Sequence, residues 1–559
     1  MKKIFSVFLA ILIAFSMPVL IFAQTEEIEI EKQAILSALY ESDIKTIRNA
    51  IDAGIITCEE LTEYYLERIE NFNKDYNCFI TICDDAIQIA RERDTQLSKG
   101  ENVGLLFGIP IVIKDNMNLA GYYTTNGHYK ANSTVASENA QVVDYLLEQG
   151  AIIIGKTNMS TDAQDARTSY SEVVGETKNA YNTWLSAGGS SGGSAVAVSQ
   201  NFAVAGLGTD TNSSLRLPAV LNGCISLRPT LKLIPFDGCT HLNSGRDAIG
   251  AITRNAYDQA IMLDVLTSGE FSYTQNLDNN AFEGKRIGII SELISPVSAS
   301  TIRESDPEIR KDLINSFGIN ERVEKYIDEE ILTTFNLATE EIKNLGADVV
   351  LLSYPELFDD AYVTFTNRES SYKNEFYNKI KALMEEHNID AIIFPTYLSS
   401  PLKSGVDDNG KNWNVWQNQA FINNCKVISP STGMPEISLP IGYHSTGAGI
   451  GMEILADKNC EQMLLNMAYT YTEAYNHRVT SSGAPDLYAN SNQGDLQSII
   501  NKYTVPVISD NDSESVDEPT QQTIDSNTSG QSSVITIAII IIIAFVAVGL
   551  IIILLIKRL

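Results

Sequence analysis

Residues 186–230 read SAGGSSGGSAVAVSQNFAVAGLGTDTNSSLRLPAVLNGCISLRPT, and this stretch decides how the whole chain is interpreted. It opens with a glycine and serine loop, Gly188 to Gly193, where backbone N–H groups can converge because no Cβ atoms obstruct them. The apolar run AVAVSQNFAVA follows and predicts a buried helix. A second polar loop, Gly208 to Ser214, comes next. The pattern therefore predicts two serine loops that bracket one buried element.

An apolar segment that ends in lysine lies upstream of these loops. Residues 108–125 read GIPIVIKDNMNLAGYYTT, which predicts a buried strand that carries Lys114 into the core. Together with residues 150–160, 175–182 and 247–269, these segments resemble the amidase signature family of serine hydrolases. The resemblance is strongest from about residue 104 to 270 and resumes weakly at residues 390–396 and 429–443.

The resemblance implies an α/β fold with a large central mixed sheet flanked by helices on both faces. It also implies a cofactor-free amidase with a Ser–Ser–Lys triad, in which Ser214 is the nucleophile, Ser190 is a bridging serine in a cis peptide, and Lys114 is the base. A lysine acts as a base near neutral pH only if burial lowers its pKa, and the apolar run before Lys114 fits that requirement.

The loop around the nucleophile supplies the other predicted site residues. Backbone N–H groups of residues 211 to 214 are expected to hold the oxyanion, so Thr211, Asn212 and Ser213 are assigned to oxyanion and substrate binding. Three further residues are assigned to structural support: Ser191, Asp210 and Arg216. Asp210 and Arg216 are expected to form an ion pair that holds the loop, with a catalytic role as the alternative.

Each assignment has a structural alternative. The neighbouring Asp115 could neutralise Lys114, which would make the lysine a buried paired group. The glycine-rich loop could be a turn in which Ser190 or Ser191 caps a helix. The coincidence of the lysine segment with both loops favours the catalytic interpretation.

The sequence departs from the family at the most sensitive point. Asn212-Ser213 precedes the nucleophile where Gly-Gly or Asp-Gly is usual, and serine adopts a left-handed backbone less readily than glycine. The region from Pro355 to Asp390 is short, and residues 161–164 lack the usual acidic and bulky apolar pair. Two alternatives therefore stay open: a degenerate member that binds an amide or peptide ligand, and a subunit of a glutamyl-tRNA amidotransferase.

Two other motif matches are discounted. Residues 150–157 have P-loop spacing, but their bulky apolar residues predict a buried strand. Residues 189–193 fit the G-x-S-x-G elbow, but no strand is predicted before them. None of the five histidines has a triad context, and no metal-binding spacing is present.

The ends of the chain predict the domain organisation and location. Residues 1–23 resemble a signal peptide, although an uncleaved anchor is the alternative, and 24–508 form the expected amidase domain. Residues 509–533 are expected to be a disordered tether, 534–556 a transmembrane helix, and 557–559 a cytoplasmic tail. The positive charge at the far end then predicts a single-pass protein of the cell membrane with its catalytic domain outside.

Composition adds constraints on partners. With 40 basic and 70 acidic residues, the chain is too acidic to favour nucleic acid, so the expected partners are a small-molecule or peptide amide and the lipid bilayer. The 7 cysteines show no regular pairing pattern, which predicts free thiols or at most an occasional bridge such as Cys78–Cys83.

Hydrophobic periodicity completes the expected element map. Residues 28–97 are predicted to be helical, and strands are predicted at residues 106–114, 151–157 and 286–290. Residues 322–346 predict a helix that runs into the strand ADVVLL, and residues 292–321 predict a surface excursion.

Overall fold

A computed structural model describes residues 32–101, 104–130, 133–294, 327–366, 369–404 and 422–489. The chain divides into the units Met1–Thr504 and Val505–Leu559, and all described residues belong to the first. The predicted signal peptide, tether, transmembrane helix and tail lie outside the described residues, as does nearly all of the predicted surface excursion. Within the ranges described, no helix combines the length and the apolar character that crossing a membrane requires.

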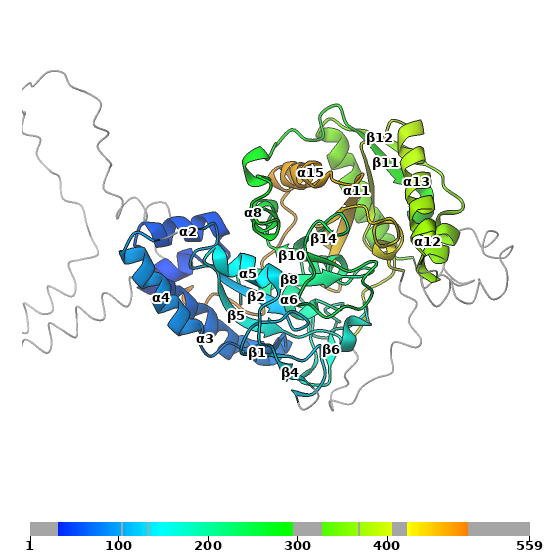
Figure 1. Cartoon of the computed structure of the whole chain (residues 1–559). Helices are drawn as coiled ribbons and strands as arrows, with labels where there is room; N and C mark the ends of the chain where they lie inside the picture. Colours follow the sequence, from blue (N-terminus) through cyan, green and yellow to red (C-terminus); the bar gives the residue numbers. More distant parts are fainter. Residues whose placement is uncertain are drawn as a thin grey trace, which may run out of the picture. The chain divides into compact units, whose positions relative to one another are not determined.

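A mixed sheet of 11 strands organises the first unit (Figure 1). The strand order is β1-β5-β2-β8-β10-β9-β14-β15-β13-β11-β12. The parallel neighbours are β5 with β2, β2 with β8, β13 with β11, and β11 with β12, and the other neighbours are antiparallel. The strands span Phe79–Ile82 (β1), Pro110–Lys114 (β2), Ile152–Thr157 (β5), Ala205–Asp210 (β8), Ile225–Arg228 (β9), Ala248–Thr253 (β10), Arg286–Ile290 (β11), Asp348–Leu352 (β12), Ala391–Pro395 (β13), Glu436–Tyr443 (β14) and Gly449–Leu455 (β15).

Helices cover both faces of this sheet, which confirms the predicted α/β class. The α-helices span Ile44–Asp52 (α2), Cys58–Tyr76 (α3), Ala86–Ser98 (α4), Gln141–Glu148 (α5), Gly192–Ser199 (α6), Arg216–Leu221 (α7), Ala256–Leu266 (α8), Glu329–Asn344 (α11), Leu357–Thr366 (α12), Ser370–Glu386 (α13), Ser429–Thr432 (α14) and Glu461–Ala474 (α15). Helices α6 and α7 contact each other, α8 contacts both α5 and α15, and both α6 and α8 pack on strand β10. Two small two-stranded sheets pair Tyr123–Thr124 (β3) with Thr134–Val135 (β4) and Tyr170–Ser171 (β6) with Gly175–Glu176 (β7).

The central strands are buried on both faces, because helices cover them from either side. Every residue of β2, β5, β8 and β10 is buried. Such strands appear in a sequence as nearly continuous apolar runs, and they can carry a polar side chain only where it finds a partner inside the protein. The end of β2 is therefore a position where a lysine must be accommodated by the core.

The N-terminal region differs from its prediction in one element. Residues 28–97 contain the expected helices, but β1 interrupts them and pairs antiparallel with β5. Helix α3 begins at a capping box formed by Thr57 and Glu60 and ends at Asn77, whose backbone is left-handed. The next residues, FITI, are aromatic and β-branched, and they extend along the sheet edge. A four-residue strand is too short for a periodicity argument to separate it from flanking helices.

The predicted buried helix in residues 195–205 is shorter than expected. Helix α6 ends at Ser199, Asn201 adopts a left-handed backbone, and β8 begins at Ala205. One continuous apolar run therefore supplies both the end of a helix and the start of a strand, which both require apolar residues in a fully buried layer.

All seven cysteines lie in the described part of the chain and all are unpaired. The Cys78–Cys83 bridge that the sequence left open is not formed. These residues flank the extended strand β1, so their Cα atoms are separated by about 16 Å at ~3.3 Å per residue. A disulfide requires Cα atoms within about 7 Å.

Candidate active site

Lys114 is the last residue of β2, and its side chain is fully buried. Its Nζ atom lies 2.7 Å from Ser190 Oγ and 2.8 Å from Thr209 Oγ1. Burial lowers the pKa of the Lys114 ammonium to about 7, although the charges of Asp210 and Asp247 oppose the shift. At neutral pH a large fraction of this lysine is therefore uncharged and can accept a proton.

Asp115 does not neutralise Lys114. Successive residues of a strand point to opposite faces, and the Asp115 carboxylate lies 3.1 Å from Lys156 Nζ and accepts a hydrogen bond from the Thr125 backbone. Burial raises the pKa of Asp115, and Lys156 opposes that shift. The two adjacent charged residues thus belong to separate buried clusters, and Lys114 is left facing hydroxyl groups.

The glycine-rich loop that contains Ser190 and Ser191 is tightly enclosed. The Gly189–Ser190 peptide bond is cis, and a Cβ atom on Gly189 would lie 2.1 Å from the carbonyl oxygen of Thr168. Ser190 is fully buried, and its carbonyl accepts from the Ser160 N–H at 3.3 Å. Only glycine fits such a close approach of two backbone segments.

Ser191 connects this loop to the polar loop that contains Ser214. It precedes helix α6, but its side chain forms no capping hydrogen bond, so the helix-capping alternative does not describe it. Its hydroxyl donates to the Thr209 carbonyl at 3.3 Å, and its N–H donates to the Ser214 carbonyl at 3.0 Å. Ser191 therefore joins both β8 and Ser214 to the glycine-rich loop.

Ser214 lies between the end of β8 and the start of α7, and it is almost fully buried. Among the residues that the structure describes, its hydroxyl has no hydrogen-bond partner. The backbone N–H groups of Asn212, Ser213 and Ser214 likewise donate to no acceptor in the described part of the chain. The loop thus presents one free hydroxyl and a row of free N–H donors, which is the arrangement that an oxyanion needs.

The residues before Ser214 do not require a left-handed backbone. Neither Asn212 nor Ser213 has a positive φ angle, so the steric concern raised by the missing glycines does not arise. Ser213 Oγ accepts from Asn423 Nδ2 at 2.9 Å, and Asn212 Oδ1 accepts from Arg246 Nη1 at 3.2 Å. Both side chains therefore add contacts that glycine would lack.

Thr211 contributes a further contact at the start of this loop. Its hydroxyl donates to Asp247 Oδ1 at 2.6 Å, in the segment just before β10. The Thr211 side chain is therefore turned toward the sheet and fixes the loop.

Asp210 and Arg216 form a buried ion pair that closes the loop around Ser214, with Arg216 Nε 3.1 Å from Asp210 Oδ2. The Leu215 N–H donates to the same carboxylate at 3.2 Å, and Arg216 Nη2 donates to the Asn212 carbonyl at 2.9 Å. Burial alone would raise the pKa of Asp210, but Arg216 and Arg228 outweigh burial and hold it below its usual range. The carboxylate is therefore ionised and fully paired, which is a structural arrangement.

Sequence reasoning missed three residues that contact the site. Thr209 receives Lys114, and its position five residues before Ser214 in the polar loop was the available signal. Asn423 and Arg246 belong to distant segments of the chain and contact the two residues before Ser214. Nothing in the local sequence around Asn423 marks it, because its role depends on the fold alone.

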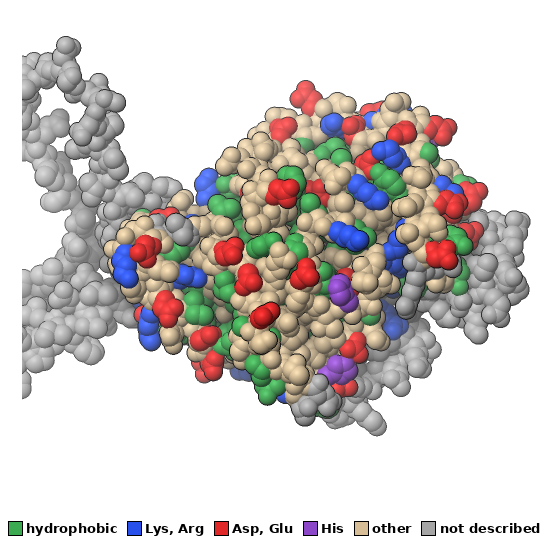
Figure 2. Space-filling model, in the orientation of Figure 1, with side chains coloured by type: hydrophobic (Ala, Val, Ile, Leu, Met, Phe, Trp, Pro, Cys, Tyr) green, Lys and Arg blue, Asp and Glu red, His purple; other side chains and the backbone are tan. Residues whose placement is uncertain are grey.

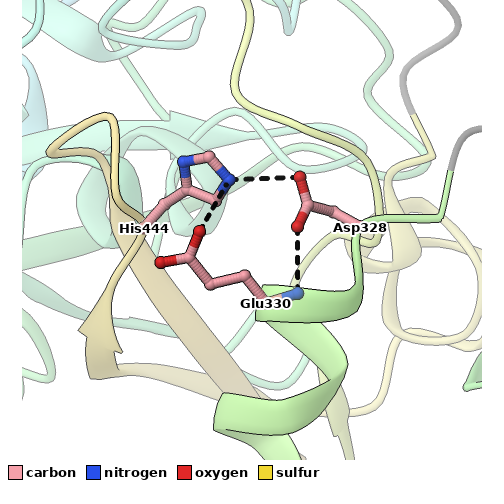
Figure 3. A group of neighbouring side chains, drawn as sticks. All are labelled: Asp328, Glu330 and His444. Carbon is pink, nitrogen blue, oxygen red and sulfur yellow. Dashed lines mark hydrogen bonds and ion pairs between the residues drawn. The ribbon is translucent and has the colours of Figure 1, made fainter.

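Two clusters in the described residues have metal-ligand chemistry. The first contains Asp328, Glu330 and His444 (Figure 3). His444 Nε2 lies 3.1 Å from Asp328 Oδ2 and 3.3 Å from Glu330 Oε2, and the other ring nitrogen lies 2.7 Å from Thr446 Oγ1. Asp328 also caps helix α11. These partners account for the ring nitrogens and both carboxylates, and the cluster pins α11 to the β14–β15 hairpin.

The second cluster contains Cys425, Glu436 and Glu453, all fully buried. A guanidinium group is already present there, because Arg216 Nη1 contacts Glu436 Oε1 and lies 3.5 Å from Glu453 Oε2. An arginine in this position supplies the positive charge that a metal ion would bring, so these residues do not fit a metal site.

The surface drawn in Figure 2 has acidic and basic side chains interspersed. On that face the described residues form no continuous basic patch of the kind that binds nucleic acid.

Comparison with solved structures shows the class of fold to which the chain belongs. The structure of the native peptide amidase from Stenotrophomonas maltophilia aligns with a TM-score of 0.63 at 24% identity, covering 79% of this chain and 98% of that one. A bacterial aryl acylamidase of the amidase signature family aligns with a TM-score of 0.63 at 18% identity, covering 82% and 99%. The fold is therefore that of amidase signature enzymes.

The family follows from the sequence comparisons. The chain belongs to the amidase family, because the Amidase family model matches residues 60–465. The chain is 29% identical to a glutamyl-tRNA(Gln) amidotransferase subunit of Thermoanaerobacter pseudethanolicus, over 78% of this chain and 97% of that one. It is also 29% identical to mandelamide hydrolase of Pseudomonas putida, over 74% and 87%. The predicted family and enzyme class, an amidase acting on carbon–nitrogen bonds, are confirmed.

The predicted location at the cell membrane, with the catalytic domain outside, is wrong. Sequence relatives from several organisms are named as subunits of glutamyl-tRNA(Gln) amidotransferase, and these relatives contradict the predicted location. The predicted contact with the lipid bilayer has no support among the described residues. The prediction relied on two terminal apolar runs, both of which lie outside the described residues.

Proposed function

We propose that this protein hydrolyses the carbon–nitrogen bond of a carboxamide, with Ser214 as nucleophile, Ser190 as proton relay and Lys114 as base. The observation that carries the proposal is the 2.7 Å contact between Lys114 Nζ and Ser190 Oγ in a fully buried site. A lysine with a pKa of about 7 is the base that such a relay needs.

The reaction then follows from these positions. Neutral Lys114 accepts the proton of Ser190, and Ser190 Oγ accepts the proton of Ser214 while Ser214 Oγ attacks the amide carbonyl. The free N–H groups of residues 212 to 214 stabilise the oxyanion. When the carbon–nitrogen bond breaks, the proton returns through Ser190 to the leaving nitrogen. Water hydrolyses the acyl-enzyme by the same relay in reverse order.

The relay requires Ser190 and Ser214 to approach each other when substrate binds. Their hydroxyl groups form no hydrogen bond in the described structure, whereas the Ser191–Ser214 backbone contact holds the two loops together. Catalytic hydrogen bonds are commonly long in a ligand-free enzyme and shorten in the substrate complex.

Oxyanion and substrate binding is assigned to the segment Thr211, Asn212 and Ser213. Side-chain contacts with Asp247, Arg246 and Asn423 hold this segment, which restricts the movement of its N–H groups. Such preorganised donors act without reorganisation during the reaction. The support that Ser191, Asp210 and Arg216 give to the loop has the same effect.

The proposal is tested by release of ammonia or amine from a panel of amides by the full chain. The panel includes mandelamide and peptide amides, which are the substrates that the names of two similar proteins indicate. Ser214→Ala and Lys114→Ala should each abolish turnover, and labelling by a fluorophosphonate should disappear in Ser214→Ala.

Ser199→Ala is a matched control, because Ser199 is a buried serine on the neighbouring helix α6 whose hydroxyl has no partner among the described residues. It should label and turn over as the unaltered protein does. If no amide is cleaved and Ser214 does not label, the protein is a ligand-binding member of the family.

A second candidate is ammonia transfer within an amidotransferase, which the likeness to one of the subunits of such a complex favours. Both candidates share the attack on an amide carbonyl. They differ in that a transferase subunit would release ammonia mainly in the presence of partner subunits and an acceptor. Turnover of amides by the chain alone would favour the hydrolase.

A further inference from the structure

Two glutamates lie side by side beneath the nucleophile loop. On the antiparallel strands β14 and β15, Glu436 is opposite Leu455 and Ser438 is opposite Glu453, so the two glutamates are diagonal neighbours on one face of the sheet. Both are fully buried, and a carboxylate oxygen of each lies within 4.8 Å of one from the other. Two ionised carboxylates at this separation would repel each other strongly in a water-free interior.

In each of the two glutamates, one carboxylate oxygen lacks a hydrogen bond among the described residues. Glu436 Oε1 contacts Arg216 Nη1, and Glu453 Oε1 accepts from Thr396 Oγ1 at 2.7 Å and from Cys425 Sγ at 3.4 Å. The Oε2 atom of each glutamate accepts no hydrogen bond from the part of the chain that the structure describes, and the Arg216 Nη1 atom lies 3.5 Å from Glu453 Oε2. A buried carboxylate oxygen without a donor is costly, but a proton placed between two such oxygens satisfies both.

The charge balance of the surrounding cluster also requires one proton. The acidic groups are Asp210 at the end of β8, Glu436 on β14 and Glu453 on β15, and the basic groups are Arg216 on α7 and Arg228 on β9. With three carboxylates and two guanidinium groups, one proton makes the cluster neutral. The nearby Cys425 thiol stays protonated, because burial raises its pKa well above the usual value.

We propose that Glu436 and Glu453 share one proton, and that in this state they position Arg216 so that it holds the nucleophile loop at the carbonyl of Asn212. The effect on catalysis rests on the proposed function of Ser214, whereas the shared proton does not. Burial raises the pKa of both carboxyl groups, with Arg216 acting in the opposite direction.

Loss of the shared proton at alkaline pH has a defined structural consequence. A second full negative charge then faces Arg216 from the sheet and competes with Asp210 and the Asn212 carbonyl for its guanidinium group. The loop loses its anchor, so activity should fall at alkaline pH. This fall is distinct from the rise near pH 7 that Lys114 produces, because it has the opposite sign and a different origin.

The experiment compares E436Q, E453Q and the double variant in the full chain. Each single variant keeps one carboxylate for Arg216 and has an amide N–H in place of the shared proton, so it should keep the rise near pH 7 but lose the alkaline fall. The double variant leaves one positive charge in excess, and its kcat/KM should be about tenfold below the product of the single effects. An unchanged alkaline fall in both single variants would overturn the proposal.

Two measurements test the shared proton without activity. The infrared spectrum at pH 7 should show a protonated carboxyl carbonyl band that is missing from each single variant.

Unfolding by urea adds a second test. A carboxyl pKa raised by folding stabilises the protein fully below about pH 4.3 and loses that effect as pH rises through the folded pKa. Each single variant should lack this downward slope of stability with pH.

The outcomes separate the two proposals. If the band and the slope are present but no amide is cleaved, the shared proton stands and the proposed function fails. If amides are cleaved but the infrared spectra of E436Q and E453Q equal that of the unaltered protein, the shared proton is absent. A metal ion in the purified protein that E436Q and E453Q both abolish would also overturn the inference.

Discussion

Lys114 is the residue whose environment most directly controls the proposed chemistry. It is fully buried against two hydroxyl groups, and no carboxylate of the described residues lies within hydrogen-bonding distance of it. Desolvation therefore governs its protonation and lowers its pKa to about 7. The pH dependence of the reaction rate of the full chain measures this pKa.

We expect kcat/KM for amide hydrolysis to rise as pH increases through about 7, because only the neutral form of Lys114 accepts a proton. Lys114→Arg keeps a positive charge at every accessible pH, so it should reduce kcat/KM at least about a hundredfold and remove this rise. A pH profile of initial rates measures both effects. A variant that keeps the rise would show that another group is the base.

Ser213 offers a second test at the scale of a residue. Ser213→Ala removes the acceptor of the buried Asn423 amide, whose other atom, Oδ1, has no hydrogen-bond partner in the described structure. We expect a loss of about 1–3 kcal/mol in the free energy of unfolding, measured with urea. The exposed Ser98→Ala is the control and should change stability by less than about 0.5 kcal/mol. Equal stabilities of the two variants would mean that the Asn423 contact contributes little.

At the scale of elements, the cluster of Asp328, Glu330 and His444 pins helix α11 to the β14–β15 hairpin (Figure 3). Asp328 caps the helix through the Glu330 N–H and also contacts His444 and Ser400. Burial alone would raise the Asp328 pKa, but the hydrogen bonds from Ser400, Glu330 and His444 lower it. The cluster therefore stabilises the ionised form.

Asp328→Ala should lower the free energy of unfolding by about 0.5–2 kcal/mol at pH 7. Because folding lowers the Asp328 pKa, its contribution is complete above the unfolded value of about 3.9 and disappears as pH falls through the lower folded value. Urea unfolding at several pH values should show the two proteins converging below about pH 4. The exposed Asp348→Ala provides the control, and its effect at pH 7 should be smaller.

At the scale of the whole molecule, residues near the two ends of the first unit's described part are joined through the core. One apolar cluster contains both Ile35 and Ala484. Arg68 on helix α3 is fully buried and donates to the carbonyls of Gln200 and Asn201 and to those of Ala484 and Pro485. The segment after α15 is therefore part of the fold.

Arg68→Ala should destabilise the protein by about 3 kcal/mol or more, because four carbonyl groups lose a charged donor, three of them in buried hydrogen bonds. Thermal unfolding monitored by circular dichroism measures the loss. Arg91→Ala is the matched control: this arginine is largely exposed beside Glu59, and its removal should cost far less stability than that of Arg68. A small effect of Arg68→Ala would show that the segment around Ala484 is not coupled to the core.

The organisation of the chain beyond this unit is still a prediction. The amidase domain over residues 24–508 stays a prediction, and the described ranges all lie inside those bounds. The predicted leader, tether and apolar C-terminal segment lie outside those ranges, and the cell-surface location inferred from them is contradicted by the relatives.

The family, the α/β class and the candidate residues can all be read from the amino-acid sequence. It could do so because the glycine-rich loops, Lys114 at the end of an apolar strand, and Ser190 and Ser214 are local patterns, each readable within a few residues. Long helices such as α3 and α11 were predicted for the same reason, since their periodicity extends over several turns. The short strand β1 and the early end of α6 were not, because neither has room for a period.

Which charged groups act together depends instead on how the chain folds. Asp115 turns away from Lys114 to Lys156, and the Asn423 amide reaches Ser213 across 210 residues of sequence. Glu436 and Glu453 meet Arg216 because two strands and a helix converge there. Protonation of a buried group depends on desolvation and on neighbours within a few ångströms, and the chain brings these neighbours together only when it folds.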